Sequence, residues 1–270
     1  MKRLIAIAVA VGLSAAAQAD LATGFEDYNA SAAGTLLTGQ QGWYLPVAGS
    51  ADYSVFTYAG NTYNFPPNPQ GGNNFVIGKS LGGTSYARTQ HDHDFSAGGL
   101  WLFSYDSSAQ FNGTATTADY LGSFSIQTNP NPVTLNIWND NNNPTLYHSS
   151  YITTQYAVPG ISPGPAWTNL LPNHWYRQTT LVDFSANNQI LEVSIQDLTA
   201  GGLPTVVAPN GWHLTAFSPP VANGIRFFAG GANTGGGNTE AWDNLSVLPV
   251  PEPTGALLLG LAAAAFLRRR

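Results

Sequence analysis

One dense cluster of side chains in this sequence could ligate a transition metal, the run His91-Asp92-His93-Asp94. On a β-strand alternate side chains share a face, so the two histidines could place two imidazoles on one Zn²⁺. A catalytic zinc usually has a third protein ligand. The remaining histidines are distant in sequence: His148, His174 and His213. We therefore favour a polar loop before the strand that contains Leu100 over a zinc site.

Residues suited to polysaccharide cleavage are few. A retaining glycosidase needs two carboxylates about 5 Å apart, yet Glu192 is followed two residues later by Ser194 and not by a second acid. His174, Tyr176 and Arg177 could supply a base and a group that neutralises a uronate, but they form no lyase signature. A G-x-S-x-G motif and cysteine are both absent from the sequence. We expect a protein that is not an enzyme, with a secreted glycosidase or lyase as the alternative.

A candidate sugar contact is Trp138, which shares the polar face of an expected strand with Asn136. An indole can stack on a sugar ring, while Asn136 and Asp140 bond hydroxyl groups. The alternative is that the following loop covers Trp138. The asparagines around Asp140 are rich in oxygen but lack the acidic spacing of an EF-hand, so we interpret them as a solvated turn.

Short alternating segments predict β-structure throughout the middle of the chain. Phe124 and Ile126 alternate with polar residues, and so do the apolar residues of 133–138 and 191–196. Residues 185–188 supply the turn of a long hairpin, and the apolar run 99–105 predicts a central strand covered on both faces. About a dozen such strands predict an all-β fold, a two-sheet antiparallel sandwich of the jelly-roll kind.

The N-terminus has the pattern of a secretory signal. Lys2 and Arg3 precede an apolar stretch, and Ala17 and Ala19 form an A-x-A cleavage site, so residues 1–19 are predicted to be a signal peptide with a helical core. The mature chain would begin at Asp20 and form one β-sandwich domain over residues 20–248.

The mature region is acidic. Residues 20–250 hold fourteen acidic and four basic side chains, a formal net charge of −10. Nucleic acid is therefore excluded as a partner, because phosphate binding needs clustered Lys and Arg. Neutral glycans and divalent cations remain as plausible partners. Without cysteine the domain forms no disulfides, so its stability comes from its core.

The C-terminus predicts a short membrane anchor. Residues 254–267 are apolar and would form a helix of roughly 21 Å, which is short against a hydrocarbon core of about 30 Å. Arg268, Arg269 and Arg270 follow, and the positive-inside tendency places them in the cytoplasm with the domain outside.

Pro251, Glu252 and Pro253, the apolar span and the terminal arginines together resemble the PEP-CTERM sorting tail, which would cover residues 249–270. The resemblance implies a Gram-negative bacterium that makes extracellular polysaccharide. It also implies export by the secretion machinery and recognition by an exosortase-type membrane peptidase, which removes or replaces the tail. The three PEP residues and the three arginines would be recognition residues, and the protein would be anchored only transiently before it reaches the cell surface or the extracellular matrix.

The middle of the chain resembles concanavalin A-like and laminin-G-like jelly rolls. The segments that carry this resemblance are residues 24–28, 39–43, 175–177, 183–184 and 241–247. It implies that the first and last strands lie side by side, and that a carboxylate from each can hold a structural Ca²⁺ with backbone carbonyls. Glu26 and Asp243 match those positions, although either could instead cap a turn or accept backbone hydrogen bonds. The E-x-D-x-x-E motif of the laminarinase-like members is absent.

Together these patterns predict an exported, exosortase-sorted envelope or matrix protein, possessing no catalytic site and with exopolysaccharide as its candidate ligand. A purely structural matrix protein, whose surface meets polysaccharide through many weak contacts, is equally compatible with the sequence.

Overall fold

The computed structural model describes residues 21–46, 50–79, 87–95, 98–110, 120–127, 145–150, 153–155, 166–168, 171, 173–185, 189–208, 212–213, 224–229 and 239–250. Within these segments no helix has the length and apolar character that crossing a membrane requires. The expected signal peptide (1–19) and membrane helix (254–267) both lie outside the described residues.

The described part of the chain contains seventeen strands, and all the pairings between them are antiparallel. Their bounds are β1 Leu21–Thr23, β2 Thr35–Leu36, β3 Trp43–Tyr44, β4 Tyr53–Thr57, β5 Asn74–Lys79, β6 Ala87–Asp92, β7 Leu100–Gln110, β8 Tyr120–Gln127, β9 Thr145–Ser150, β10 Thr153–Gln155, β11 Ala166–Thr168, β12 Tyr176–Asp183, β13 Gln189–Asp197, β14 Thr205–Ala208, β15 Trp212–His213, β16 Gly224–Ala229 and β17 Thr239–Val250.

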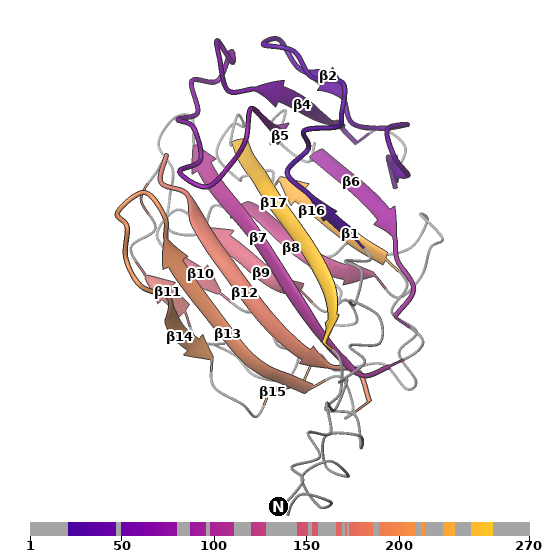
Figure 1. Cartoon of the computed structure of the whole chain (residues 1–270), viewed down its shortest axis with the longest axis vertical. Coiled ribbons are helices and arrows are strands. Elements are labelled where there is room, and N and C mark those ends of the chain that lie inside the picture. Colours follow the sequence, from indigo (N-terminus) through magenta and orange to yellow (C-terminus); the bar gives the residue numbers. More distant parts are fainter. Residues whose placement is uncertain are drawn as a thin grey trace, which may run out of the picture.

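The strands form two sheets, which confirms the expected antiparallel β-sandwich. The large sheet has the order β14-β13-β12-β7-β17-β5-β4-β2, with β1 on β17 and β15 on β13; the small sheet has the order β11-β10-β9-β8-β16-β6-β3. Figure 1 shows β13, β12, β7 and β17 of the large sheet in front, with β8 to β11 of the small sheet behind. The outer face of the large sheet, which points away from the small sheet, is turned toward the reader.

The main core fills the space between the sheets and is rich in aromatic rings. Phe227 of the small sheet stacks between Trp43 and Trp242, with ring centroids 5.3 and 4.7 Å away. Along β12 buried and partly exposed residues alternate strictly, because successive side chains of a strand point to opposite faces. A sandwich without disulfides depends on such burial for its stability.

A second, smaller apolar cluster lies on the outer face of the large sheet, under the β4–β5 loop (residues 58–73). Phe75 of β5 stacks on Tyr58 of this loop at 4.2 Å, and the Trp175 indole donates a hydrogen bond to the Pro66 carbonyl at 2.8 Å. The loop therefore covers one end of the outer face and leaves the rest open.

A β-bulge in β17 changes which side chains face the main core. Asn244 has a φ of 47°, a left-handed conformation that asparagine tolerates better than most residues, and the register with β7 shifts between Asp243 and Ser246. Trp242 therefore packs inward before the bulge, and Leu245 packs inward after it. Asp243 is left on the outer face.

Several predicted local features are confirmed, whereas the strand expected at 133–138 lies outside the described residues. The β12–β13 hairpin forms as expected, and β1 lies beside β17 with Leu21 opposite Val247. The interpretation of 99–105 was wrong in one respect. The strand is central, but both of its faces are buried only over 105–108, where the β4–β5 loop covers it, whereas between Leu100 and Ser104 its outer face is partly exposed.

Gly78 of β5 lies directly opposite Tyr53 of β4, and a β-carbon at Gly78 would clash with the fully buried Tyr53 ring. We expect Gly78→Ala to lower the free energy of unfolding by about 1–3 kcal/mol, since the ring has no free space to move into. Urea denaturation measures this. Gly202→Ala is the control, because its β-carbon would meet only the Asp197 carbonyl at 3.9 Å; equal losses in both variants would contradict the packing argument.

Candidate functional site

Two carboxylates lie side by side in the middle of the large sheet. Asp106 of β7 and Asp243 of β17 are register partners on the outer face, and neither has solvent exposure. Adjacent buried acids are costly unless each has hydrogen-bond donors or a counter-charge. We refer to these two residues and the side chains that bind them as the carboxylate cluster.

Asp106 has a cationic partner. The Arg177 guanidinium donates to it twice, from Nε to Oδ1 at 2.7 Å and from Nη2 to Oδ2 at 2.8 Å. The amide groups of Asn68 and Asn244 also donate to Oδ2, at 2.7 and 2.8 Å. Arg177 remains 28% exposed, so this bidentate pair forms the part of the cluster that meets solvent.

Asp243 is bound by neutral donors. Its Oδ2 accepts from the Tyr58 hydroxyl at 2.9 Å and from Asn68 at 3.2 Å, and its Oδ1 accepts from the Asn244 backbone N–H at 2.7 Å. Burial raises the pKa of Asp243 to about 7, these hydrogen bonds lower it in part, and the neighbouring Asp106 adds to the rise. Burial and Asp243 together also hold the pKa of Tyr58 well above its usual value.

Glu26 lies next to the cluster, just after β1. Its Oε1 accepts backbone N–H groups from Asn73 at 2.7 Å and Asn74 at 2.9 Å. Acceptance of backbone hydrogen bonds was the alternative to calcium binding that the sequence analysis left open for Glu26. Glu26 and Asp243 also approach one loop closely, because a β-carbon on Gly72 would clash with Glu26 and one on Gly71 would clash with Asp243.

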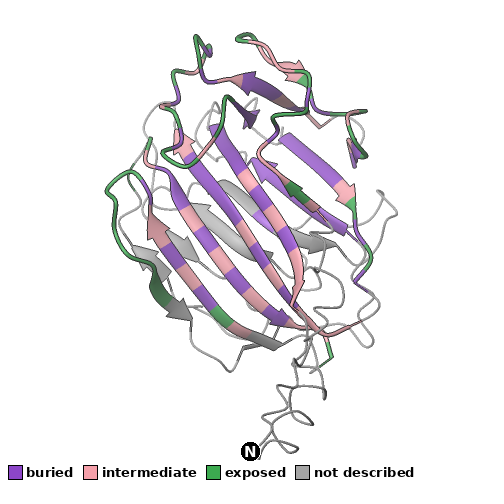
Figure 2. Ribbon diagram, in the orientation of Figure 1, coloured by how far each residue is buried: buried purple, intermediate pink, exposed green. Residues whose placement is uncertain are grey.

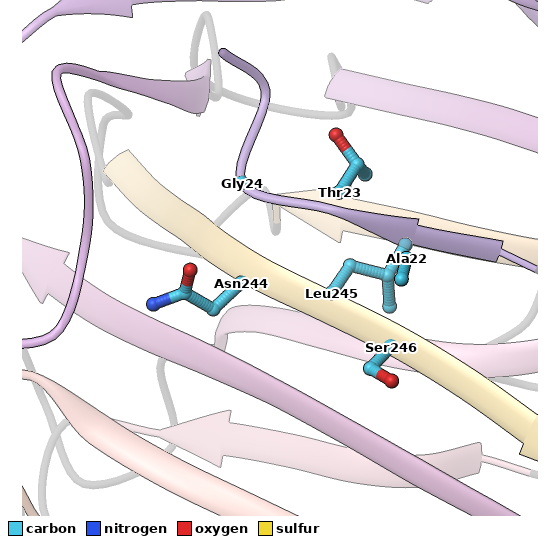
Figure 3. Close-up of a pocket in the computed structure, with 6 residues that line it drawn as sticks. All are labelled: Ala22, Thr23, Gly24, Asn244, Leu245 and Ser246. Atoms are coloured by element: carbon cyan, nitrogen blue, oxygen red, sulfur yellow. The ribbon is translucent and has the colours of Figure 1, made fainter. Parts of the chain in front are cut away.

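The oxygen atoms near Gly24 suit a hard cation. A β-carbon there would lie 3.3 Å from Asn244 Oδ1 and 3.8 Å from Asp243 Oδ1. Figure 3 shows the Asn244 amide oxygen turned toward Gly24 at the edge of a hollow of about 320 Å³. The residues that line this hollow are Ala22, Thr23, Gly24, Asn244, Leu245 and Ser246.

Donor chemistry therefore fits Ca²⁺, which prefers carboxylate and carbonyl oxygens. Glu26, Asp243 and Asn244 would hold the ion, and its charge would compensate the buried carboxylate. Among the described residues, however, no three His, Cys, Asp or Glu side chains gather as a metal site. The calcium site stays a prediction.

The two histidines of the 91–94 run do not share a site. His91 Nε2 lies 3.2 Å from the Gln41 carbonyl, and its ring contacts Trp43. His93 follows the end of β6 and packs against Phe95 and Trp101. The pairing of imidazoles considered for zinc required one continuous strand, and β6 ends too early to provide it.

Asp92 belongs instead to a hydrogen-bonded chain on the small sheet. Tyr44 donates to Asp92 at 2.8 Å, Gln90 donates to the Tyr44 hydroxyl at 2.6 Å, and Arg226 Nε donates to Gln90 at 2.9 Å. Burial and the nearby Arg88 lower the pKa of Arg226 to about 10. This chain links β3, β6 and β16.

The 174–177 run is also divided. Tyr176 points into the main core and accepts a hydrogen bond from the Leu171 N–H, whereas Arg177 lies on the outer face with Asp106. His174 contacts Asp197 at 2.9 Å. These three side chains therefore do not meet in one cleft.

Several candidate residues lie outside the described residues, so the structure does not place them. They are the glycan candidates Asn136, Trp138 and Asp140, the cleavage residues Ala17 and Ala19, and the sorting residues Pro251, Glu252, Pro253, Arg268, Arg269 and Arg270.

Asp106 and Asn68 were missed as site residues. One signal was available for Asp106, an acid in the interior of a long, largely apolar strand, where an unpaired charge is costly. Nothing in the sequence near Asn68 indicates its partners, which lie 38 and 175 residues away.

Beyond the carboxylate cluster, no residue in the described part of the chain covers the outer face of the large sheet, and the side chains of this face are ordered in rows across the strands. One row is made of hydroxyl side chains and the next of an acid and three leucines. The hydroxyl row is Ser194, Thr179, Ser104 and Ser246, and the leucine row is Glu192, Leu181, Leu102 and Leu248. Figure 2 shows these strands as alternating buried and partly exposed bands, so every second side chain reaches solvent. With strands about 4.8 Å apart, each row spans roughly 14 Å. We call this surface the open face.

No family model matches the chain, and no curated protein matches it by sequence. Solved structures do match. Cellulose induced protein Cip1 is 12% identical, with a TM-score of 0.51, and the match covers 86% of this chain and 98% of that one. At this identity the likeness shows the fold, a sandwich of two antiparallel sheets.

Other matches have lower TM-scores. The carbohydrate esterase vb_24B_21 of the Shiga toxin-encoding bacteriophage phi24B is 13% identical with a TM-score of 0.43, covering 82% of this chain and 98% of the esterase. Peanut lectin is 12% identical with a TM-score of 0.43, covering 66% of this chain and 88% of the lectin.

The raised pKa of Asp243 predicts a pH dependence of stability in the presence of a chelator. Between about pH 4 and 7 the folded protein keeps a proton on Asp243 that the unfolded chain has lost. The free energy of unfolding should therefore fall by roughly 1 kcal/mol per pH unit as the pH rises through this window. Urea titrations of the native protein and of Asp243→Asn test this. The native slope should be shallower in Asp243→Asn and retained in Asp52→Asn, which alters a carboxylate outside the cluster; an unchanged slope in Asp243→Asn would refute the assignment.

Proposed function

We propose that this chain is an exported, non-enzymatic envelope or extracellular-matrix protein that binds a neutral polysaccharide. Export is supported by the N-terminal pattern that ends at Ala17 and Ala19. Sorting is supported by the resemblance of residues 249–270 to a PEP-CTERM tail, with an exosortase-type peptidase as the processing partner. The formal charge of −10 over residues 20–250 supports a neutral ligand.

The open face is the observation that carries the binding proposal. Hydroxyl groups in a row can both donate to and accept from sugar hydroxyls, and the adjacent leucines can contact the apolar faces of sugar rings. The face adjoins Arg177, whose charge is already matched by Asp106. A chain of uncharged sugars lying across β13, β12, β7 and β17 would contact both rows.

Calcium has a structural part in this proposal. An ion held by Glu26, Asp243 and Asn244 would join the segment after β1 to the bulge of β17 and would favour the ionised form of Asp243. The open face lies on the same sheet, so the ion would act by stabilising the sheet and not by touching the glycan.

The alternative function, a polysaccharide-degrading enzyme, has one observation in its favour. Asp106 and Asp243 are paired carboxylates in different environments, and such pairs supply acid and base in glycosidases. Both, however, are fully buried under the β4–β5 loop and bound by fixed donors, so a sugar cannot reach them in this arrangement. We therefore prefer the binding protein.

Calcium should raise the melting temperature of the native protein at pH 7.5 by several degrees relative to chelator, because the ion binds only the folded state. Glu26→Gln and Asp243→Asn should abolish the shift. Glu192→Gln, which removes an exposed acid from β13, should retain it. Identical melting curves with calcium and with chelator would remove calcium from the proposal.

Binding to a glycan array tests the central proposal. We expect the native protein to bind an uncharged polysaccharide, and Ser104→Ala/Thr179→Ala to weaken binding about thirtyfold, since two lost hydrogen bonds cost about 1 kcal/mol each. Trp138→Ala tests the other candidate site. Loss of binding in Trp138→Ala alone would move the site away from the open face, and a native protein that binds no glycan would refute the binding function.

The sorting tail is tested in the native host. Replacement of Pro251, Glu252 and Pro253 by alanine should leave an unprocessed protein of higher mass in the membrane fraction. Pro67→Ala, at an exposed loop proline, is the control and should be processed normally. Normal processing of the triple variant would show that this tail is not a recognition signal.

A further inference from the structure

The spacing of the rows on the open face restricts which polysaccharides can use it. The strands β13, β12, β7 and β17 lie next to one another in the large sheet (Figure 1), and each contributes one side chain to the hydroxyl row. Opposed residues of antiparallel strands are about 4.5–5.5 Å apart, so the four side chains repeat at about 5 Å. This repeat is close to the length of one sugar residue in a fully extended glycan.

The leucine row runs beside the hydroxyl row, two residues away on each strand. At about 3.4 Å per residue the two rows are roughly 7 Å apart, which is comparable with the width of a pyranose ring. A ring that lies flat on Leu102 or Leu181 can therefore reach the hydroxyl of Ser104 or Thr179 with its edge. These four side chains are all partly exposed, so a ligand can contact both rows at once.

The direction of a bound glycan follows from where the face is blocked. Along β7 the outward side chains are Leu102, Ser104 and then Asp106, which is sealed under the β4–β5 loop. A glycan parallel to this strand would meet one hydroxyl before the loop stops it. A glycan that crosses the strands meets the whole hydroxyl row and the whole leucine row, so the crossing direction is favoured.

The hydroxyl row ends in an apolar side chain on both sides. Ser246 lies opposite Ala22 of β1, and Ser194 lies opposite Val206 of β14. Both Ala22 and Val206 are exposed, but neither side chain has a hydrogen-bonding group. Side-chain hydrogen bonds along the row are therefore limited to four consecutive sugar residues.

Ring stereochemistry decides which neutral glycan fits these two rows. In β-1,4-linked glucose every ring substituent is equatorial, so the hydroxyl groups lie at the ring edges, both ring faces are apolar and the chain is an extended ribbon. In an α-1,4-linked chain of the same sugar the backbone coils, so successive rings leave the row. Neighbouring strands are rotated by about 20–25°, and a single ribbon can follow this twist by rotating about its linkages.

We propose that the open face binds four consecutive sugar residues of a single, extended β-1,4-linked glucan, which crosses β13, β12, β7 and β17 with one ring on each strand. Three rings would lie on the leucines, and on β13 Glu192 would accept a hydrogen bond from a sugar hydroxyl. Glu192 and Asp183 place negative charge at one margin of the face and disfavour a chain that contains uronates. This inference rests on the proposed glycan binding and adds the linkage, conformation and length of the ligand.

Isothermal titration calorimetry of the native protein with β-1,4-linked glucose oligomers of two to six residues tests the proposal. The affinity should rise about fivefold for each added residue up to four, the effect of one further hydrogen bond, and less than about threefold from four to six. The matched control is the α-1,4-linked series of the same lengths, which should bind at least about tenfold more weakly at four residues, because a coiled chain keeps fewer rings on the row. Equal affinity for the two series would overturn the proposal, and so would a fivefold gain for each residue beyond four.

A shorter row tests whether each strand holds one ring. Ser194→Ala removes the hydroxyl at the β13 end, so it should lower the affinity for the four-residue oligomer about fivefold and leave that for the three-residue oligomer within about twofold. Thr205→Ala is the control, because it removes an exposed hydroxyl of β14 that lies outside the row, and both affinities should be unchanged. Equal losses for the two oligomers in Ser194→Ala would overturn the assignment of rings to strands.

The glycan array separates failure of this inference from failure of the binding function. Suppose that the native protein binds another glycan in a manner that depends on Ser104 and Thr179, but binds no β-1,4-linked glucose oligomer. The ligand class would then be wrong, and the binding function of the open face would stand. A native protein that binds no glycan at all would refute both.

Discussion

Two buried carboxylates on neighbouring strands, Asp106 and Asp243, impose the strongest constraint on this structure. Acids in this position are tolerated only where donors surround them, and the donors come from three separate parts of the chain. Arg177 arrives on β12, Tyr58 and Asn68 on the β4–β5 loop, and Asn244 through the bulge that directly follows Asp243. The position of that loop, the bulge in β17 and the pairing of β7 with β12 are all linked through this one polar centre.

The loop that satisfies the acids also decides which part of the outer face is free. Where the β4–β5 loop covers the large sheet, Asp106 and Asp243 are sealed under Asn68 and an aromatic cluster that includes Trp175. Further along the same strands nothing among the described residues covers the hydroxyl and leucine rows, and every second side chain reaches solvent. One sheet therefore provides a sealed polar centre and an accessible surface side by side, which is why the acids are better explained by structure than by catalysis.

Sequence patterns were sufficient for the layers of this fold and insufficient for its site. Alternation in 122–127 and 191–196 identified strands correctly because the pleat imposes a period of two, and the turn at 185–188 located the hairpin. Asp243 was singled out from the sequence as a calcium ligand; it lies on the outer face of the sheet, fully buried, and that role stays a prediction. The pairing of Asp243 with Asp106 could not be predicted, since it depends on a register between strands more than 130 residues apart. The same limitation applies to residues 100–104. Apolar residues at both odd and even positions of this segment predicted burial on both faces, but the β4–β5 loop covers only residues 105–108.

The pairing of β1 with β17 has a consequence for the order in which the chain folds. The large sheet joins strands from the beginning, middle and end of the described sequence, and its longest strand, β17, lies between β7 and β5 as well as against β1. Contacts so distant in sequence close slowly and cannot form until the last strand is available. Neither the sheet nor its polar centre can be completed while β17 is still being synthesised. Under the proposed export through a narrow translocation channel, this topology would delay folding until the whole domain has been delivered to the far side.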